Sequence, residues 1–338
     1  MTLFACRTLQ TFDTPLEPDY AWDRAAPSAE DQERFEAAWD YHQTENGLAM
    51  LVIQGDTIVF EAYANGHSAS TPWHLYSGTK TFSCAMAAKG IEQGLLTLDE
   101  PVGDTLPEFQ GTDLTVRHLL NFNSGLEQRW MDLTWDGLVV PEDQRVEDKY
   151  AYARTLPFTS EPGEVYEYGN QHLMIFGALM EAKLDQDPLP WLEQQVLDPI
   201  GLRTSGWHHD GAGNSMWPYG AWTTASEWAR FGVLLRDDGV WEGQQVLPEG
   251  TFDACSTGSD ANPAYGHGVW LNREGLFVGE SQYGDPILSA DAPDDLIAAA
   301  GAGGQRLYIA PSQDLVVVLQ TDSRTFSDAL YLGQLFAE

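Results

Sequence analysis

Short runs of apolar, β-favouring residues lie near both ends of the chain. Residues 48–53 and 57–62 form one pair of runs, separated by the turn Gln54-Gly55-Asp56. Such a turn between two β-rich runs is typical of a hairpin. Residues 306–310 and 315–320 form a second pair near the C-terminus. The pattern therefore predicts one hairpin at each end of the chain.

Helical patterns flank these runs and fill the middle of the chain. Pro27-Ser28 followed by Asp31 resembles a capping box and predicts a helix to about His42. A second helix-like stretch, 325–338, closes the chain. The segments with a helical pattern between the hairpins are 79–94, 115–121, 147–155, 171–183, 189–197 and 225–238.

Strands at both termini with helices between them predict a mixed α/β (α+β) fold. The terminal strands are expected to pair into one antiparallel sheet that is flanked by the two terminal helices. The expected division is an N-terminal extension or tether at 1–26, a sheet domain at 27–76 and 255–338, and an inserted, mostly helical domain at 77–254. A functional site is expected at the boundary between the two domains.

The composition is strongly acidic. Among 338 residues, 51 are acidic and 17 basic, which leaves a formal charge of −34. Such a charge repels phosphate backbones and anionic lipids and so disfavours nucleic-acid and membrane-surface roles. The basic residues include only four lysines (Lys80, Lys89, Lys149 and Lys183). Acidity with so little lysine favours a halophilic or marine source, the alternative being ordinary solubility.

The three cysteines, Cys6, Cys84 and Cys255, are odd in number and form no CxxC pair. They predict neither a disulfide framework nor a zinc site, and Cys84 is expected to pack in the core. No run of 18 apolar residues is present, so no membrane span is predicted. Leu3-Phe4-Ala5-Cys6 is similar to the end of a lipoprotein signal. The compartment stays open between extracytoplasmic, with a lipid anchor on Cys6, and cytoplasmic.

The segment Ser77-Gly78-Thr79-Lys80 lies where an extended stretch gives way to an apolar helix. Residues three apart share one helix face, so the Lys80 amine is within reach of the Ser77 hydroxyl. An unassisted serine is a poor nucleophile, and acyl transfer requires a base beside it. A helix start also offers backbone N–H groups to a developing oxyanion. The alternative interpretation is a capping serine with a solvated lysine.

Two further elements fit acyl-transfer chemistry. Tyr168-Gly169-Asn170 directly precedes an apolar helix, and a tyrosine near a lysine can relay the serine proton. The small-residue run 300–305 precedes the C-terminal hairpin. Its glycines, Gly301 and Gly303 among them, allow the backbone to approach a substrate, and the run could present a second oxyanion N–H. The alternatives are a surface turn and a flexible loop.

Other candidates are weaker. His208-His209-Asp210 has the composition of a metal site but lacks a third imidazole or cysteine nearby, and a solvated loop is the default interpretation. Tyr76, Trp222 and Trp270 are candidates to line a substrate pocket. The chain contains neither Gly-x-Ser-x-Gly nor His-Glu-x-x-His. No metal or organic cofactor is implied.

The three elements resemble, in order and rough spacing, those of the serine β-lactamase and D-alanyl-D-alanine peptidase superfamily, specifically its class C-like branch. The resemblance covers about residues 45–320. It implies Ser77 as nucleophile, with Lys80 and Tyr168 handling protons and Asn170 as partner of both substrate and lysine. It also implies an oxyanion hole made by the N–H groups of Ser77 and Ala302.

The third element departs from the β-lactamase pattern, because it lacks the cationic triplet that helps to hold a substrate carboxylate. It is similar instead to that of esterases and aminohexanoate-oligomer hydrolases of the superfamily. The predicted function is therefore hydrolysis of a small ester or amide through an acyl-enzyme. The alternatives are a β-lactamase or D-alanyl-D-alanine carboxypeptidase and, from another class, a non-catalytic penicillin-binding-like module. The sequence leaves the oligomeric state open.

Overall fold

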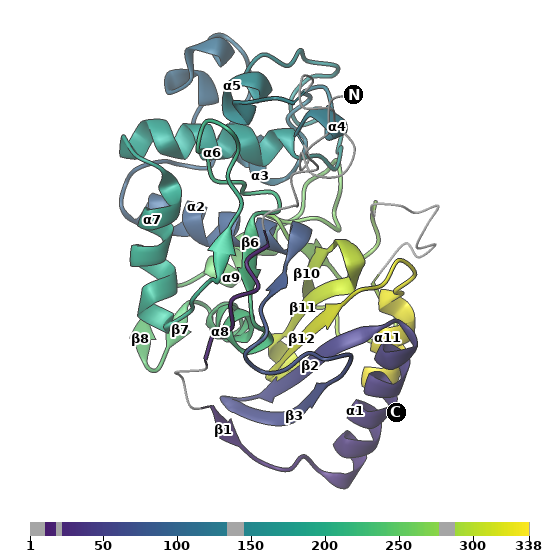
Figure 1. The fold of residues 1–338 in the computed structure, drawn as a ribbon. Coiled ribbons are helices and arrows are strands. Elements are labelled where there is room, and N and C mark those ends of the chain that lie inside the picture. Colours follow the sequence, from purple (N-terminus) through teal and green to yellow (C-terminus); the bar gives the residue numbers. More distant parts are fainter. Residues whose placement is uncertain (1–10, 18–21, 134–144, 277–287, 338) are drawn as a thin grey trace, which may run out of the picture.

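A single mixed sheet forms the base of the molecule in the computed structural model, which describes residues 11–17, 22–133, 145–276 and 288–337 (Figure 1). Within the described part, the strand order is β1-β3-β2-β12-β11-β10-β9. The strands are β1 (Asp23–Arg24), β2 (Gly47–Gln54), β3 (Thr57–Tyr63), β9 (Trp270–Leu271), β10 (Ile297–Gly301), β11 (Gln305–Ala310) and β12 (Leu315–Thr321).

The two ends of the chain meet in the middle of this sheet. β2 and β12 pair antiparallel, with Val52 opposite Val317, and each also belongs to a predicted hairpin, β2 with β3 and β11 with β12. β12 is buried along its whole length. A strand is buried in this way when both faces of its sheet are covered.

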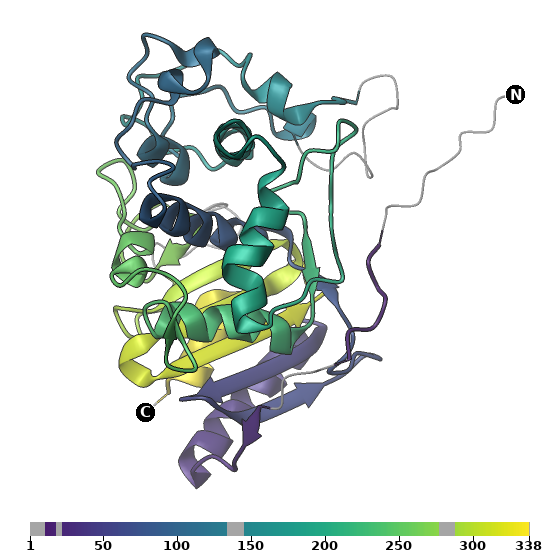
Figure 2. The same ribbon diagram turned by 90° about the vertical axis from the view of Figure 1, so that its left-hand side faces the viewer.

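Helices cover both faces of the sheet. The terminal helices α1 (Ala29–Thr44) and α11 (Asp328–Leu335) pack together on one face, and α8 (Ala225–Arg236) lies on the other (Figures 1 and 2). At the start of α1, Ser28 accepts a hydrogen bond of 3.0 Å from the Asp31 N–H, as the capping pattern predicts. The predicted fold class, an antiparallel sheet flanked by terminal helices, is confirmed.

The middle of the chain is mostly helical, and a large part of it lies above the sheet in Figure 1. Its α-helices are α2 (Phe82–Glu92), α3 (Val116–Leu120), α4 (Trp130–Leu133), α5 (Lys149–Ala153), α6 (Gln171–Leu184), α7 (Pro188–Leu192) and α9 (Thr251–Cys255). Its short strands are β4 (Trp73–His74), β5 (Gly206–Trp207), β6 (Ala221–Thr223), β7 (Val240–Trp241) and β8 (Gln244–Gln245). The remaining short helices of the described residues are η1 (Tyr76–Thr81), η2 (Val102–Asp104), η3 (Pro107–Phe109), η5 (Glu193–Leu197), η6 (Asp198–Ile200), η7 (Ala302–Gly304) and η8 (Pro311–Gln313). None of the helices in the described residues is long and apolar enough to cross a membrane.

The structure shows two features that the predicted domain boundaries did not include. Residues 23–24 pair in parallel with β3, and Trp22 is buried against the Trp241 ring. Residues 22–24, at the end of the predicted tether, therefore belong to the sheet and the core. In addition, α8 packs directly on the sheet, where Gly232 leaves room for Val316 and Leu307, although it lies inside the segment expected to form a separate helical domain.

A disulfide joins Cys84 of α2 to Cys255 at the end of α9. The two Cα atoms are 5.7 Å apart, and both residues are buried. The expectation that the cysteines form no disulfide is therefore wrong, whereas the prediction that Cys84 packs in the core is confirmed. The bond spans 171 residues of sequence, and such a long-range pair has no local spacing that a sequence pattern could reveal. Cys6 lies outside the described residues.

Candidate active site

Ser77 and Lys80 lie on η1, a 3₁₀ helix that follows β4 and leads into α2. A 3₁₀ helix has three residues per turn, so side chains three apart lie directly above one another. The Lys80 Nζ accordingly lies 3.0 Å from the Ser77 Oγ and donates a hydrogen bond to it. Ser77 is partly exposed, whereas Lys80 is buried. The hydroxyl can thus meet a ligand while the amine stays away from solvent.

The Lys80 amine is enclosed by oxygen atoms and lacks a carboxylate partner among the described residues. It donates to the Pro218 carbonyl at 2.8 Å and to the Asn170 Oδ1 at 3.4 Å, besides Ser77. Burial lowers the pKa of the Lys80 amine well below its usual range, because desolvation penalises the charged form. At this amine, burial therefore outweighs the strongly negative net charge of the protein in setting the direction of the pKa shift.

Tyr168 and Asn170 reach the same place from the segment just before α6. The Tyr168 ring lies under the Lys80 amine, with 5.0 Å between Nζ and the ring centroid. Asn170 is buried and its Nδ2 donates to the Leu133 carbonyl at 3.4 Å. The structure therefore brings together the hydroxyl, amine, phenol ring and amide that the sequence motifs singled out, across about ninety residues of chain.

The small-residue run lies beside the serine segment. β10 ends at Gly301 against η1, where a Cβ on Gly301 would overlap the Leu75 carbonyl oxygen. Only glycine allows this approach. Ala302 then opens η7 and is exposed, and Gly303 follows with a φ of 79°. The predicted third element is thus adjacent to the segment that carries Ser77.

Two features of the site were not predicted. Tyr76, directly before Ser77, has a φ of 48°, a left-handed conformation that is unusual for an aromatic residue and that clusters at functional sites. An aromatic wall also borders Tyr168: Trp270 stacks on it at 5.5 Å and contacts Tyr265 at 4.7 Å. Tyr166 lies 5.4 Å from Tyr265. The sequence pointed to Trp270 but not to either tyrosine, because nothing local distinguishes them from core residues.

The segment His208-His209-Asp210 has separate structural partners. The His208 Nε2 accepts from the Trp222 indole at 3.0 Å, and the Asp210 carboxylate accepts from the backbone N–H of Lys149 at 2.8 Å. Among the described residues, no group of three or more metal-ligating side chains is close enough to hold an ion. In the described part of the chain, the geometry therefore gives no support to a metal site at this segment.

Lys80→Met should change how stability depends on pH. Between its lowered pKa and the ordinary value of 10.5, the folded protein holds fewer protons on Lys80 than the unfolded chain does. The free energy of unfolding of the parent should therefore rise relative to that of Lys80→Met as pH increases toward 10.5, by up to about 1.4 kcal/mol per unit. Urea denaturation of both proteins at several pH values measures this difference. A constant difference would contradict the lowered pKa.

Comparison with known proteins identifies the family of this chain. The beta-lactamase family model matches residues 32–334. The chain belongs to the beta-lactamase family. Penicillin-binding protein 4* of Bacillus subtilis is 25% identical over 182 residues, which cover 51% of this chain but only 40% of that protein. The match thus spans less than half of the length of this curated relative of the family.

Solved structures share the fold of this family member. A Bacillus anthracis protein described as a 6-aminohexanoate-dimer hydrolase has a TM-score of 0.72 at 19% identity, covering 96% of this chain and 88% of its own. EstCE1, a hydrolase with promiscuous acyltransferase activity, has a TM-score of 0.69 at 17% identity, covering 91% and 98%. At these identities the likeness concerns the fold alone.

Proposed function

We propose that this protein is a serine hydrolase that cleaves small esters or amides through an acyl-enzyme. The observation that carries the proposal is the distance of 3.0 Å between the partly exposed Ser77 hydroxyl and the buried Lys80 amine, whose pKa is lowered. A nucleophile within hydrogen-bond reach of a base is the arrangement that acyl transfer requires. Family membership supports the same chemistry.

The proposed cycle starts with attack of the Ser77 Oγ on the substrate carbonyl carbon, while the Lys80 amine takes the serine proton. The backbone N–H groups of Ser77 and Ala302 stabilise the tetrahedral oxyanion. The leaving group departs with a proton relayed through Tyr168, whose ring lies under Nζ. Water then attacks the acyl-enzyme and gives a proton to the base, which passes it to the departing Ser77 oxygen as the acid is released. Asn170 holds the Lys80 amine in place.

The substrate preference follows from what surrounds the serine. The third element, Gly301-Ala302-Gly303, carries no cationic side chain to hold a substrate carboxylate. Half-buried Tyr168 instead packs against the buried rings of Trp270 and Tyr265, so aromatic rather than cationic side chains border this side of the serine. Uncharged esters and amides are therefore favoured over anionic β-lactams. The names of the two structural neighbours, a 6-aminohexanoate-dimer hydrolase and a hydrolase with acyltransferase activity, agree with this preference.

A panel of three chromogenic substrates tests this proposal. We expect kcat/KM to be highest for a short-chain p-nitrophenyl ester, lower for a neutral p-nitroanilide, and lowest for a chromogenic cephalosporin. The order follows because the ester has the best leaving group and the cephalosporin carries a carboxylate without a cationic partner in the third element. A cephalosporin hydrolysed faster than the ester would favour the β-lactamase alternative. The assays should be run at low and at high salt, because salt screens the repulsion between the acidic surface and an anionic substrate.

A further inference from the structure

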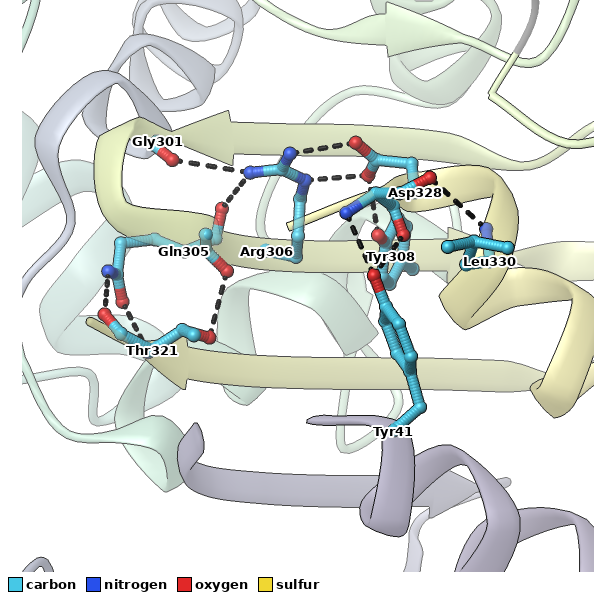
Figure 3. A network of polar contacts seen from close by, with 10 residues as sticks. Tyr41, Gly301, Gln305, Arg306, Tyr308, Thr321, Asp328 and Leu330 are labelled. Atoms are coloured by element: carbon cyan, nitrogen blue, oxygen red, sulfur yellow. Dashed lines mark hydrogen bonds and ion pairs between the residues drawn. The ribbon is translucent and has the colours of Figure 1, made fainter. Parts of the chain in front are cut away.

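We propose that Arg306 is a positioning residue for the oxyanion hole: its guanidinium orients and polarises the peptide group whose N–H belongs to Ala302. The inference rests on the proposed function, since it concerns the N–H assigned to the oxyanion. Figure 3 shows the arrangement, with the Arg306 side chain between the Gly301 carbonyl and the Asp328 carboxylate.

The geometry links Arg306 to the Ala302 N–H through a single peptide group. The Arg306 Nη1 donates to the Gly301 carbonyl oxygen at 3.2 Å. That carbonyl and the Ala302 N–H belong to the same planar trans peptide and point in opposite directions. A guanidinium that fixes the carbonyl therefore also fixes the direction of the N–H. The Gly301 end of this peptide is already held against η1, close to the Leu75 carbonyl.

The charge on Arg306 adds to this effect. A hydrogen bond from a charged donor to a carbonyl is stronger than a neutral one and polarises the groups bonded to it. The Ala302 N–H should thus become a better donor to a developing negative charge. The side chain is only 8% exposed, so the interaction is weakly screened by water.

The guanidinium is itself rigidly held. Its Nε and Nη2 donate to the two oxygens of Asp328 at 2.6 and 2.7 Å, a two-pronged ion pair that fixes the plane of the group. The Tyr308 hydroxyl also donates to Asp328, at 2.5 Å. Nη1 makes a further hydrogen bond of 2.9 Å to the Gln305 carbonyl. The direction in which Nη1 meets Gly301 is therefore set from several sides.

The Ala302 carbonyl, the next one along the chain, is held as well. The Gln305 Nε2 donates a hydrogen bond of 3.3 Å to the Ala302 carbonyl. The same amide is held by β12: its Nε2 donates to the Thr321 carbonyl, and its Oε1 accepts from the Thr321 N–H at 3.1 Å (Figure 3). The carbonyls on both sides of the Ala302 N–H are thus anchored to β11 and β12. This buried anchoring suits a backbone N–H that must keep one direction during turnover.

A purely structural role makes a different prediction. Arg306 also ties β11 to α11 through Asp328, and loss of that tie alone would lower stability without changing the chemistry of the folded enzyme. Arg236 provides the matched control. It is a buried arginine that pairs with Asp237 and donates to the carbonyl of Gly55, in the turn between β2 and β3. No residue of the proposed site takes part in that interaction.

The experiment compares Arg306→Met, Arg306→Lys and Arg236→Met by steady-state kinetics with a p-nitrophenyl ester. The carbonyl band of the cinnamoyl-enzyme is also measured by infrared difference spectroscopy. We expect Arg306→Met to lower kcat by about 10- to 100-fold, the range found when groups behind a catalytic ligand are lost, with little change in KM. Its acyl carbonyl band should move to higher wavenumber, because a weaker donor polarises the carbonyl less. Arg306→Lys should recover part of both effects, and Arg236→Met should show neither.

If Arg306→Met does not fold, the double variant Arg306→Met/Asp328→Asn removes both buried charges, and the same kcat and band shift are expected of it. A folded Arg306 variant with the parent kcat and carbonyl band would overturn the inference. So would a kcat loss equal to that of Arg236→Met. These outcomes differ from a failure of the proposed function, in which replacement of Ser77 would leave ester hydrolysis intact.

Discussion

Ser77→Ala should lower kcat/KM for an activated ester by at least about 10⁴-fold, while the protein keeps its fold. The variant removes the oxygen that we propose attacks the substrate, and loss of the nucleophilic serine of a serine hydrolase has effects of this size or greater. The Ser77 side chain is partly exposed, so its removal leaves no buried cavity. Steady-state hydrolysis of a p-nitrophenyl ester, read against circular dichroism of both proteins, measures the loss.

Ser83→Ala is the matched control for this variant. Ser83 lies on α2, a short distance along the chain beyond Ser77, and is fully buried. Its replacement by alanine should leave the rate within about twofold of the parent. Equal, slow rates for the parent and Ser77→Ala would instead support the non-catalytic, penicillin-binding-like alternative.

Among the substitutions considered, removal of the disulfide should lower the free energy of unfolding the most. The bond between Cys84 and Cys255 closes a loop with a sequence separation of 171. The chain-entropy account assigns about 5 kcal/mol to a loop of this length. Cys84→Ala/Cys255→Ala should therefore unfold at a clearly lower urea concentration than the parent. Dithiothreitol should destabilise the parent but leave this double variant unchanged.

Cys6→Ala controls for effects of thiols in general, and its denaturation curve should match that of the parent. A parent protein whose stability does not respond to dithiothreitol, with the cysteines accessible after denaturation, would contradict the disulfide. Because disulfides persist in oxidising compartments, the bond favours the extracytoplasmic location over the cytoplasmic one.

The disulfide also braces one wall of the site. The Cys255 carbonyl accepts a hydrogen bond of 2.9 Å from the His267 N–H. Gly268 follows His267 in the chain. A Cβ there would overlap the Lys80 carbonyl. Two residues later Trp270 stacks on Tyr168. The bond therefore connects the helix after Lys80 to the segment that supplies the aromatic wall.

Features with a local cause could be predicted from the sequence. The β2–β3 hairpin, the Ser28 cap and the spacing of Ser77 and Lys80 each depend on residues within one turn of helix or one hairpin. The order of the three site elements added the family resemblance, which the family model and the fold confirm. The roles of the individual site residues remain proposals.

Features that depend on tertiary contacts could not be predicted. The left-handed backbone at Tyr76, the partner of Cys84 and the burial of Trp22 depend on segments far away in the sequence. Arg306 illustrates the same limit, since a single arginine in a β-rich run carries no sign of the Asp328 carboxylate or of the peptide group that it contacts. Nor did the sequence indicate that a Cβ at Gly301 would overlap the Leu75 carbonyl oxygen.

Covalent labelling of the serine identifies the nucleophile without any assumption about the substrate. The parent and Ser77→Ala are incubated with an alkyl fluorophosphonate, and intact-mass and peptide mass spectrometry then locate the adduct. The account predicts one phosphonyl group per parent molecule, on the peptide that contains Ser77, loss of ester hydrolysis in step with labelling, and no adduct on Ser77→Ala. An adduct on a different residue, or full turnover by a parent protein labelled at Ser77, would contradict it.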